Sequence, residues 1–140
     1  MIDSRTAPYA ALLLRTSLGV MFIAHALLKY AVFTLPGTAQ FFVSLGLPGV
    51  LAYFTFWAEL IGGSLILAGV YGRWVSAALL PILLGAAWAH AGNGWVFSAP
   101  NGGWEYPTFL AAAAVAHLLL GDGAFALSTL LGRRNAPQWA

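Results

Sequence analysis

The chain has 140 residues, of which 61% are hydrophobic and only 7% are charged. Soluble proteins carry about a quarter charged residues, so this composition excludes an ordinary soluble domain and indicates a membrane protein. Cysteine is absent, which excludes thiol–disulfide chemistry, Cys-ligated zinc and iron–sulfur clusters within the chain. The net charge of +2 rests on only six Lys and Arg residues and does not indicate nucleic-acid binding.

Four apolar stretches can cross a bilayer, at residues 9–33, 50–70, 74–91 and 106–121. They predict an all-α membrane protein, an antiparallel up-down bundle of four transmembrane helices that forms a single domain over residues 1–140. Residues 38–45 are predicted to form a short interfacial helix in the first outer loop, and residues 133–140 a polar cytoplasmic tail. Arg15 interrupts the first apolar stretch and leaves too short an apolar run for a signal peptide, so we interpret this stretch as a membrane span.

The first span carries three ionisable residues on one side. At about 100° per residue, Lys29 lies about 40° and His25 about 80° from Arg15 around the helix axis. A helix surrounded by lipid would not gather its ionisable groups in this way. This side is therefore predicted to face the other helices.

The second span carries Glu59 near the middle of an otherwise apolar run. An ionised side chain at the centre of a bilayer costs from about 2.5 kcal/mol to far more, so Glu59 is predicted to pair, to take up a proton or to line a polar cavity. Thr55, Gly62 and Gly63 share its side of the helix. The small residues on this side favour close packing against a neighbouring helix.

Positive charges set the predicted topology, because Lys and Arg accumulate on the cytoplasmic side. Four spans would gather arginines on one side, namely Arg5, Arg73, Arg133 and Arg134. We therefore expect a multi-pass protein of a bacterial-type inner (cytoplasmic) membrane with both termini in the cytoplasm. The loop before the fourth span then lies outside, where Trp95, Trp104 and Tyr106 are predicted to act as interfacial anchors.

A rise of about 1.5 Å per residue sorts the ionisable residues into two levels. The outer level, within about 10 Å of the outer surface, contains His25, Lys29, His90 and Glu105. The inner level contains Glu59 and His117 at about 17 Å and Arg15 at about 25 Å. We predict an ion pair between Lys29 and Glu105 in the outer level, and contacts of Glu59 with His117 or Arg15 in the inner one.

Two interpretations of these residues stay open. They are either structural pairs that fix helix register, or the lining of a proton path or of a pocket for a polar head group such as a quinone. For Glu59 we favour a functional role, because an apolar residue would serve packing better at that depth. His117, taken alone, is typical of a satisfied core histidine.

The histidines do not indicate a metal site. The sequence has no HExxH motif or other ligand spacing, and only His25 and His90 come near the matching depth that a bis-His haem needs. We therefore predict no metal and no covalently bound cofactor, and we do not favour haem.

Short motifs are spread in a specific order over about residues 11–128. They are Arg15 with Leu18-Gly19, Phe22, His25 and Lys29, then Phe41-Phe42 and Leu45-Gly46-Leu47-Pro48, then Ala58-Glu59, Gly62-Gly63, Gly69 and Arg73, and finally Gly103-Trp104-Glu105-Tyr106-Pro107. This ordered set resembles the DoxX family of small four-span membrane proteins.

The resemblance implies a link to membrane-bound redox systems, since members are similar to subunits of thiosulfate:quinone oxidoreductases and to membrane partners of soluble redox and sulfur-transfer enzymes. It implies no catalytic residues. Our hypothesis is a redox-associated membrane subunit with a quinone-binding polar site, at most a quinone-linked oxidoreductase subunit. The alternatives are a non-catalytic scaffold or accessory subunit and a small transporter that works as an oligomer. The expected partners are the lipid bilayer and a soluble or membrane redox enzyme, with no nucleic acid.

Overall fold

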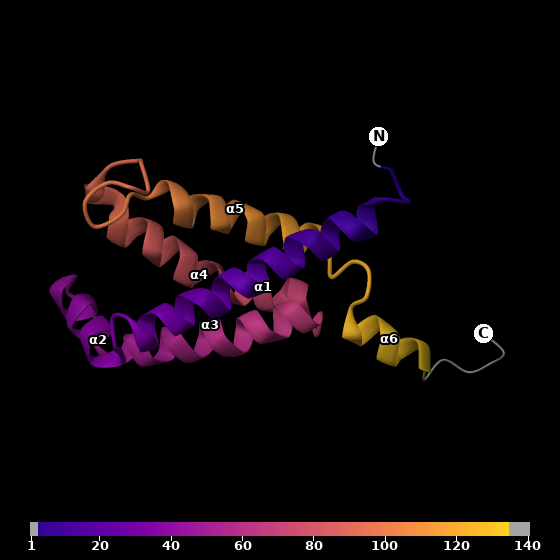
Figure 1. Ribbon diagram of the computed structural model, residues 1–140, viewed down its shortest axis with the longest axis horizontal. Coiled ribbons are helices and arrows are strands. Elements are labelled where there is room, and N and C mark those ends of the chain that lie inside the picture. Colours follow the sequence, from indigo (N-terminus) through magenta and orange to yellow (C-terminus); the bar gives the residue numbers. More distant parts are fainter. Residues whose placement is uncertain (1–2, 135–140) are drawn as a thin grey trace.

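The structure is a computed structural model that describes the backbone of residues 3–134 and the side chains of residues 3–130. The described residues contain helices and no strands, as the composition predicts (Figure 1). The helices are α1 (Ala7–Ala31), α2 (Leu35–Ser44), α3 (Val50–Ala68), α4 (Gly72–His90), the 3-10 turn η1 (Ala91–Asn93), α5 (Glu105–Leu120) and α6 (Leu127–Arg134). The side chains of Arg133 and Arg134 and the end of the predicted tail lie outside the described residues.

Three helices are long and apolar enough to cross a membrane, namely α1, α3 and the segment from Gly72 to Asn93 that contains α4 and η1. Helix α5 is apolar but has only 16 residues. At about 1.5 Å per residue it is about 24 Å long, a little shorter than the hydrocarbon core of a bilayer. The chain is therefore a membrane protein with three apolar helices of full spanning length and one shorter one.

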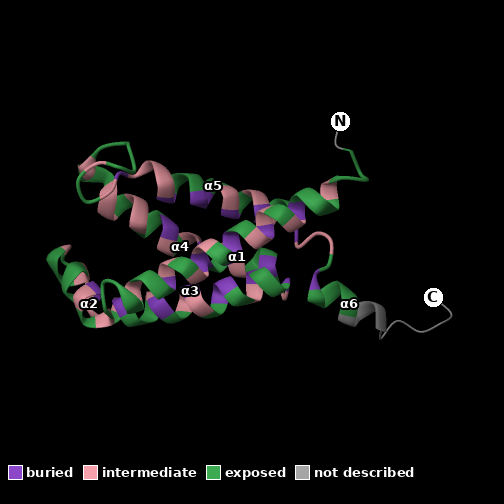
Figure 2. Cartoon of the chain, in the orientation of Figure 1, coloured by how far each residue is buried: buried purple, intermediate pink, exposed green. Residues whose placement is uncertain are grey.

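Large apolar side chains lie exposed along the long helices. Figure 2 shows exposed residues on every helix, and they include large side chains such as Leu13, Phe54, Trp57, Leu84 and Phe109. Water-soluble monomers rarely present apolar surface on this scale. These side chains suit contact with lipid tails instead.

Helices α1 and α3 pack together along their length (Figure 1). They approach each other closely at two glycines, because a Cβ atom on Gly19 would lie 2.9 Å from the Gly63 carbonyl oxygen, and one on Gly63 would lie 3.0 Å from the Gly19 carbonyl oxygen. Gly62, the residue before Gly63 in α3, leaves room for Leu79 of α4. The buried side of α3 thus combines glycines with Glu59, as predicted for a small-residue packing face.

We expect Gly63→Ala to destabilise the protein by about 1–3 kcal/mol, because the added methyl group would overpack the contact between α1 and α3. Its Cβ atom would lie 2.9 Å from the Phe22 Cβ atom. Gly85→Ala in α4 is the matched control, since a Cβ atom there meets nothing within 4 Å. Unfolding of both variants in detergent measures the difference, and equal midpoints would contradict such a close helix crossing.

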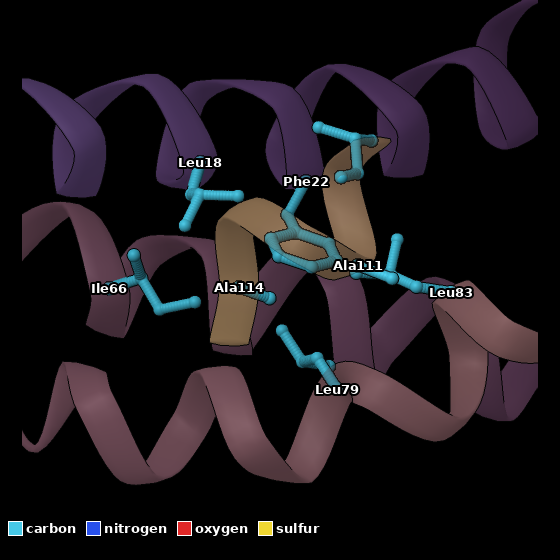
Figure 3. Close-up of a cluster of buried hydrophobic side chains, with 8 residues drawn as sticks. Leu18, Phe22, Ile66, Leu79, Leu83, Ala111 and Ala114 are labelled. Atoms are coloured by element: carbon cyan, nitrogen blue, oxygen red, sulfur yellow. The ribbon is translucent and has the colours of Figure 1, made fainter. Parts of the chain in front are cut away.

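The apolar core lies where four helices meet (Figure 3). Helix α4 packs mainly on α5 and also contacts α3. The core side chains come from α1, α3, α4 and α5, and those labelled in Figure 3 are Leu18, Phe22, Ile66, Leu79, Leu83, Ala111 and Ala114. This core separates two polar regions of the molecule, one toward each end of the helices.

The connection from α1 to α3 is mostly helical. Leu35, Pro36 and Gly37 form the first turn of α2. The Thr34 hydroxyl caps this turn by accepting a hydrogen bond from the Gly37 N–H at 3.1 Å. The predicted short helix is therefore present, and it begins three residues earlier than expected because proline fits the opening turn of a helix.

Candidate functional site

An ion pair joins the first and second long helices. Lys29 Nζ of α1 lies 2.5 Å from Glu59 Oε2 of α3, and the two side chains are only 17% and 6% exposed. Our prediction that Lys29 pairs with Glu105 is therefore wrong. The direct packing of α1 on α3 and the long lysine side chain bring Nζ to the deeper carboxylate.

Only one of the two carboxylate oxygens of Glu59 has a hydrogen bond within the described residues. The described residues give Oε1 no hydrogen bond, whereas Oε2 accepts from Lys29. His25 precedes Lys29 by one turn of α1, so it lies on the same side of that helix as the ion pair. The predicted contacts of Glu59 with His117 and Arg15 do not form among the described residues, where Lys29 is its ion-pair partner.

His25 is held in a defined tautomer beside Tyr106. Its Nδ1 atom lies 2.8 Å from the Met21 carbonyl oxygen, which can only accept, so Nδ1 carries the hydrogen. Nε2 is then an acceptor when the ring is neutral. The ring stacks on Tyr106 with centroids 5.6 Å apart and planes 20° from parallel.

Tyr106 differs from its predicted role as a surface anchor. Its ring packs against the apolar core, and its hydroxyl is buried with no hydrogen-bond partner among the described residues. A buried hydroxyl without a partner costs about 1–3 kcal/mol. Lys29, Glu59, His25 and Tyr106 together form what we call the outer polar cluster.

The other outer candidates organise the loop from Gly92 to Trp104. Glu105 Oε1 accepts from the Phe97 N–H at 2.9 Å, and His90 Nδ1 lies 3.0 Å from the Asn101 carbonyl oxygen. Trp95 and Trp104 pack edge to face with centroids 4.4 Å apart. His90 and Glu105 thus hold the loop in shape, and neither has an ion-pair partner among the described residues.

Two of the three inner candidates, Arg15 and His117, lie at Asp122, which follows α5, and with Asp122 and Ser76 they form what we call the inner cluster. The guanidinium of Arg15 donates to the Asp122 carbonyl oxygen at 2.9 Å, while its Nε is buried with no hydrogen-bond partner in the described part of the chain. The Asp122 carboxylate accepts from the N–H groups of Gly72 and Arg73, at 3.1 and 2.9 Å. It therefore satisfies the first N–H groups of α4, where an anion is stabilised by the helix dipole.

His117 belongs to this inner cluster and bonds to α4. Its Nδ1 lies 2.7 Å from the Ser76 hydroxyl oxygen, and its Nε2 lies 3.4 Å from Asp122 Oδ1. The three residues have the composition of a hydrolase triad, but Ser76 and His117 are both 0% exposed, so no substrate reaches them. The interpretation of His117 as a satisfied core histidine therefore holds for Nδ1 but not for Nε2, which is buried with no hydrogen-bond partner among the described residues.

Two positions of the inner cluster, Asp122 and Ser76, were not among our candidates. Ser76 lacks a distinctive sequence signal because a serine in a membrane helix often bonds its own backbone. Asp122 had a recognisable sequence signal. It stands between Gly121 and Gly123 on the predicted cytoplasmic side, where the first N–H groups of α4 need acceptors. Both flanking glycines have positive φ, at 82° and 70°, which lets the turn present the carboxylate to α4.

The family model described as DoxX matches residues 10–92 of the chain. The chain belongs to the DoxX family. This match contains α1 to α4 and with them the Lys29–Glu59 ion pair, whereas Tyr106 and Asp122 lie beyond it. The expected family membership is therefore confirmed over α1 to α4.

One curated relative is "Putative oxidoreductase CatD" of Bacillus subtilis (strain 168), which is 43% identical over 75 residues. The aligned part covers 54% of this DoxX protein and 54% of the relative, so the chain spans about half the length of the curated relative it matches. No solved structure matches the chain.

Proposed function

We propose that this DoxX protein is a redox-associated membrane subunit whose outer polar cluster binds the head group of a quinone. The observation that carries the proposal is the buried Tyr106 hydroxyl, which has no hydrogen-bond partner among the described residues, on a ring that stacks on His25, one helical turn before Lys29. The name of the Bacillus subtilis relative supports a link to oxidoreduction.

The chemistry of the cluster suits a group that alternates between carbonyl and hydroxyl. Tyr106 and Lys29 can donate to a quinone carbonyl, whereas His25 Nε2 and Glu59 Oε1 can accept from a quinol hydroxyl. A bound quinone would supply the electron-carrying chemistry. The side chains of this chain would bind and orient the head group, and Glu59 and His25 would hold the two protons that accompany the two-electron reduction to the quinol.

The proposal includes a four-span arrangement in an inner membrane. Helices α1, α3, α4 and α5 would cross it, with both termini in the cytoplasm and α2 at the outer interface. The loop with Trp95 and Trp104 lies at the same end of the helices as α2, which supports a common outer surface (Figure 1). In this topology the outer polar cluster lies on the outer side of the apolar core.

We expect Tyr106→Phe to weaken quinone binding by about fivefold to tenfold, as for the loss of one hydrogen bond. The variant should be as stable as the parent protein or more so, since it removes a buried hydroxyl that has no partner. Titration of the detergent-purified protein with decylubiquinone measures the affinity. Tyr53→Phe, at an exposed position of α3, is the matched control.

Equal affinities of the parent and Tyr106→Phe would contradict the proposed role of this hydroxyl. Absence of saturable quinone binding in the parent protein would contradict the quinone site as a whole. That second result would favour the scaffold or accessory subunit, in which the ion pair serves only to join α1 and α3.

A further inference from the structure

An aromatic groove lies beside the outer loop, at the start of α5. Its volume is about 430 Å³, within the range of small-ligand sites. Four aromatic residues line it, Trp95, Phe97, Tyr106 and Phe109, together with Glu105. We refer to it as the Glu105 groove.

Within the described part of the chain, no cation pairs with the Glu105 carboxylate. Lys29, which we expected as its partner, is bound to Glu59. Among the described residues, Glu105 has no ion pair, and its one side-chain hydrogen bond comes from the Phe97 N–H to Oε1. Oε2 is therefore left for a ligand.

The backbone around the groove is held in place by several contacts. The Glu105 N–H donates to the Trp95 carbonyl oxygen at 3.0 Å, and the Trp104 N–H donates to the Gly94 carbonyl oxygen at 3.2 Å. Gly103 is packed so closely on Val96 and Trp95 that a side chain would not fit there. The aromatic walls and the carboxylate are thus positioned before any ligand arrives, which lowers the entropic cost of binding.

From this combination we infer that the Glu105 groove binds an organic ammonium group. Aromatic rings attract a cation through their quadrupole, by about 0.5–1 kcal/mol at exposed sites and about 2 kcal/mol when desolvated, and the carboxylate adds charge complementarity. A bare metal ion would not use the apolar walls, and a neutral ligand would leave the carboxylate without a counter-charge. The ammonium group could be carried by a phospholipid head group, since the groove lies in the aromatic loop at one end of the helices, or by a free amine.

The inference differs from the proposed quinone site in the charged group on which it rests, which is Glu105 and not Glu59, although Tyr106 lines the groove and also belongs to the outer polar cluster. The first experiment titrates the full chain, purified in dodecyl maltoside, with choline and with its neutral isostere 3,3-dimethylbutan-1-ol. Tryptophan fluorescence reports binding, and Trp95→Phe assigns the signal to the groove. We expect saturable binding of choline and binding of the neutral isostere that is at least about tenfold weaker.

Glu105→Gln keeps an oxygen that can accept from the Phe97 N–H, so the loop should stay folded, which circular dichroism and thermal unfolding check. We expect this variant to bind choline about tenfold more weakly. Asp3→Asn, which removes a charge at an exposed position near the N-terminus, is the matched control and should bind as the parent does. Equal binding of choline and its isostere, or equal binding by Glu105→Gln and the parent, would overturn the inference.

A second arm identifies the source of the ammonium group. The parent and Glu105→Gln are placed in nanodiscs of phosphatidylethanolamine with phosphatidylglycerol, and the lipid that stays bound after detergent extraction is measured by mass spectrometry. Enrichment of phosphatidylethanolamine in the parent alone would identify a lipid head group. Choline binding in detergent without this enrichment would identify a free amine. If neither choline binding nor lipid enrichment is observed, the inference is overturned.

Discussion

Lys29→Met is expected to lower the free energy of unfolding by about 3–5 kcal/mol, because it leaves the buried carboxylate of Glu59 without its partner. Methionine keeps much of the apolar length of lysine, so the effect reports the lost charge more than lost packing. Denaturant titration of the detergent-solubilised protein measures it. Lys29 connects the two helices that pack most extensively, so the loss should weaken the whole bundle.

The double variant Lys29→Met/Glu59→Leu separates structure from function. Replacement of both partners of a buried ion pair by apolar residues is often neutral or stabilising, so stability should return to near that of the parent. Quinone binding should not return, because the cluster has lost two of its four polar groups. A stable double variant that binds decylubiquinone with the parent's affinity would contradict a functional role for the pair and leave only a structural one.

Asp122→Ala is expected to destabilise the protein by about 2–4 kcal/mol for two reasons. Helix α4 loses the side chain that caps its first N–H groups, and the buried His117 ring loses the carboxylate beside it. The carboxylate accepts from the first two N–H groups of α4 and lies 3.4 Å from His117 Nε2. Asp122→Asn keeps one oxygen acceptor and should fall between Asp122→Ala and the parent. Thermal unfolding in detergent provides the comparison.

The quinone affinity of the Asp122→Asn variant tests whether the inner cluster has only a structural role. Arg15, which bonds to the Asp122 carbonyl oxygen, and Lys29 of the outer cluster are about 21 Å apart along α1. Asp122→Asn should therefore keep the parent's quinone affinity at a temperature where it is folded. A loss of affinity as large as that of Tyr106→Phe would show that the two clusters are coupled, contrary to our assignment of the inner one to structure.

The helices were predictable because their signals are local. Long apolar runs and glycine or proline boundaries are read over neighbouring residues, and α1, α3, α4 and α5 overlap the four predicted spans. The side of α1 that carries Arg15, His25 and Lys29 also faces the bundle, since these residues are buried or half-buried. Helical periodicity was sufficient for that prediction.

The partners of the charged residues were not predictable from depth alone. Depth estimates place Lys29 beside Glu105 and Glu59 beside His117, but they ignore which helices touch and how far a side chain reaches. Helix α1 packs on α3, whereas α5 packs on α4, so Lys29 meets Glu59 and His117 meets Ser76. Tyr106 was assigned to the surface from its residue type, and the structure turns its ring toward His25 instead.

Photolabelling with an azidoquinone tests the central claim most directly. The full chain in native-like lipid nanodiscs is irradiated with the probe, with and without excess decylubiquinone, and the labelled peptides are mapped by mass spectrometry. We predict competable labels on α1 around His25 and on α5 around Tyr106, and their loss in Lys29→Met/Glu59→Leu. Labels that excess quinone does not displace, or that lie only on lipid-facing residues such as Phe54 and Leu84, would contradict a quinone site in the outer polar cluster.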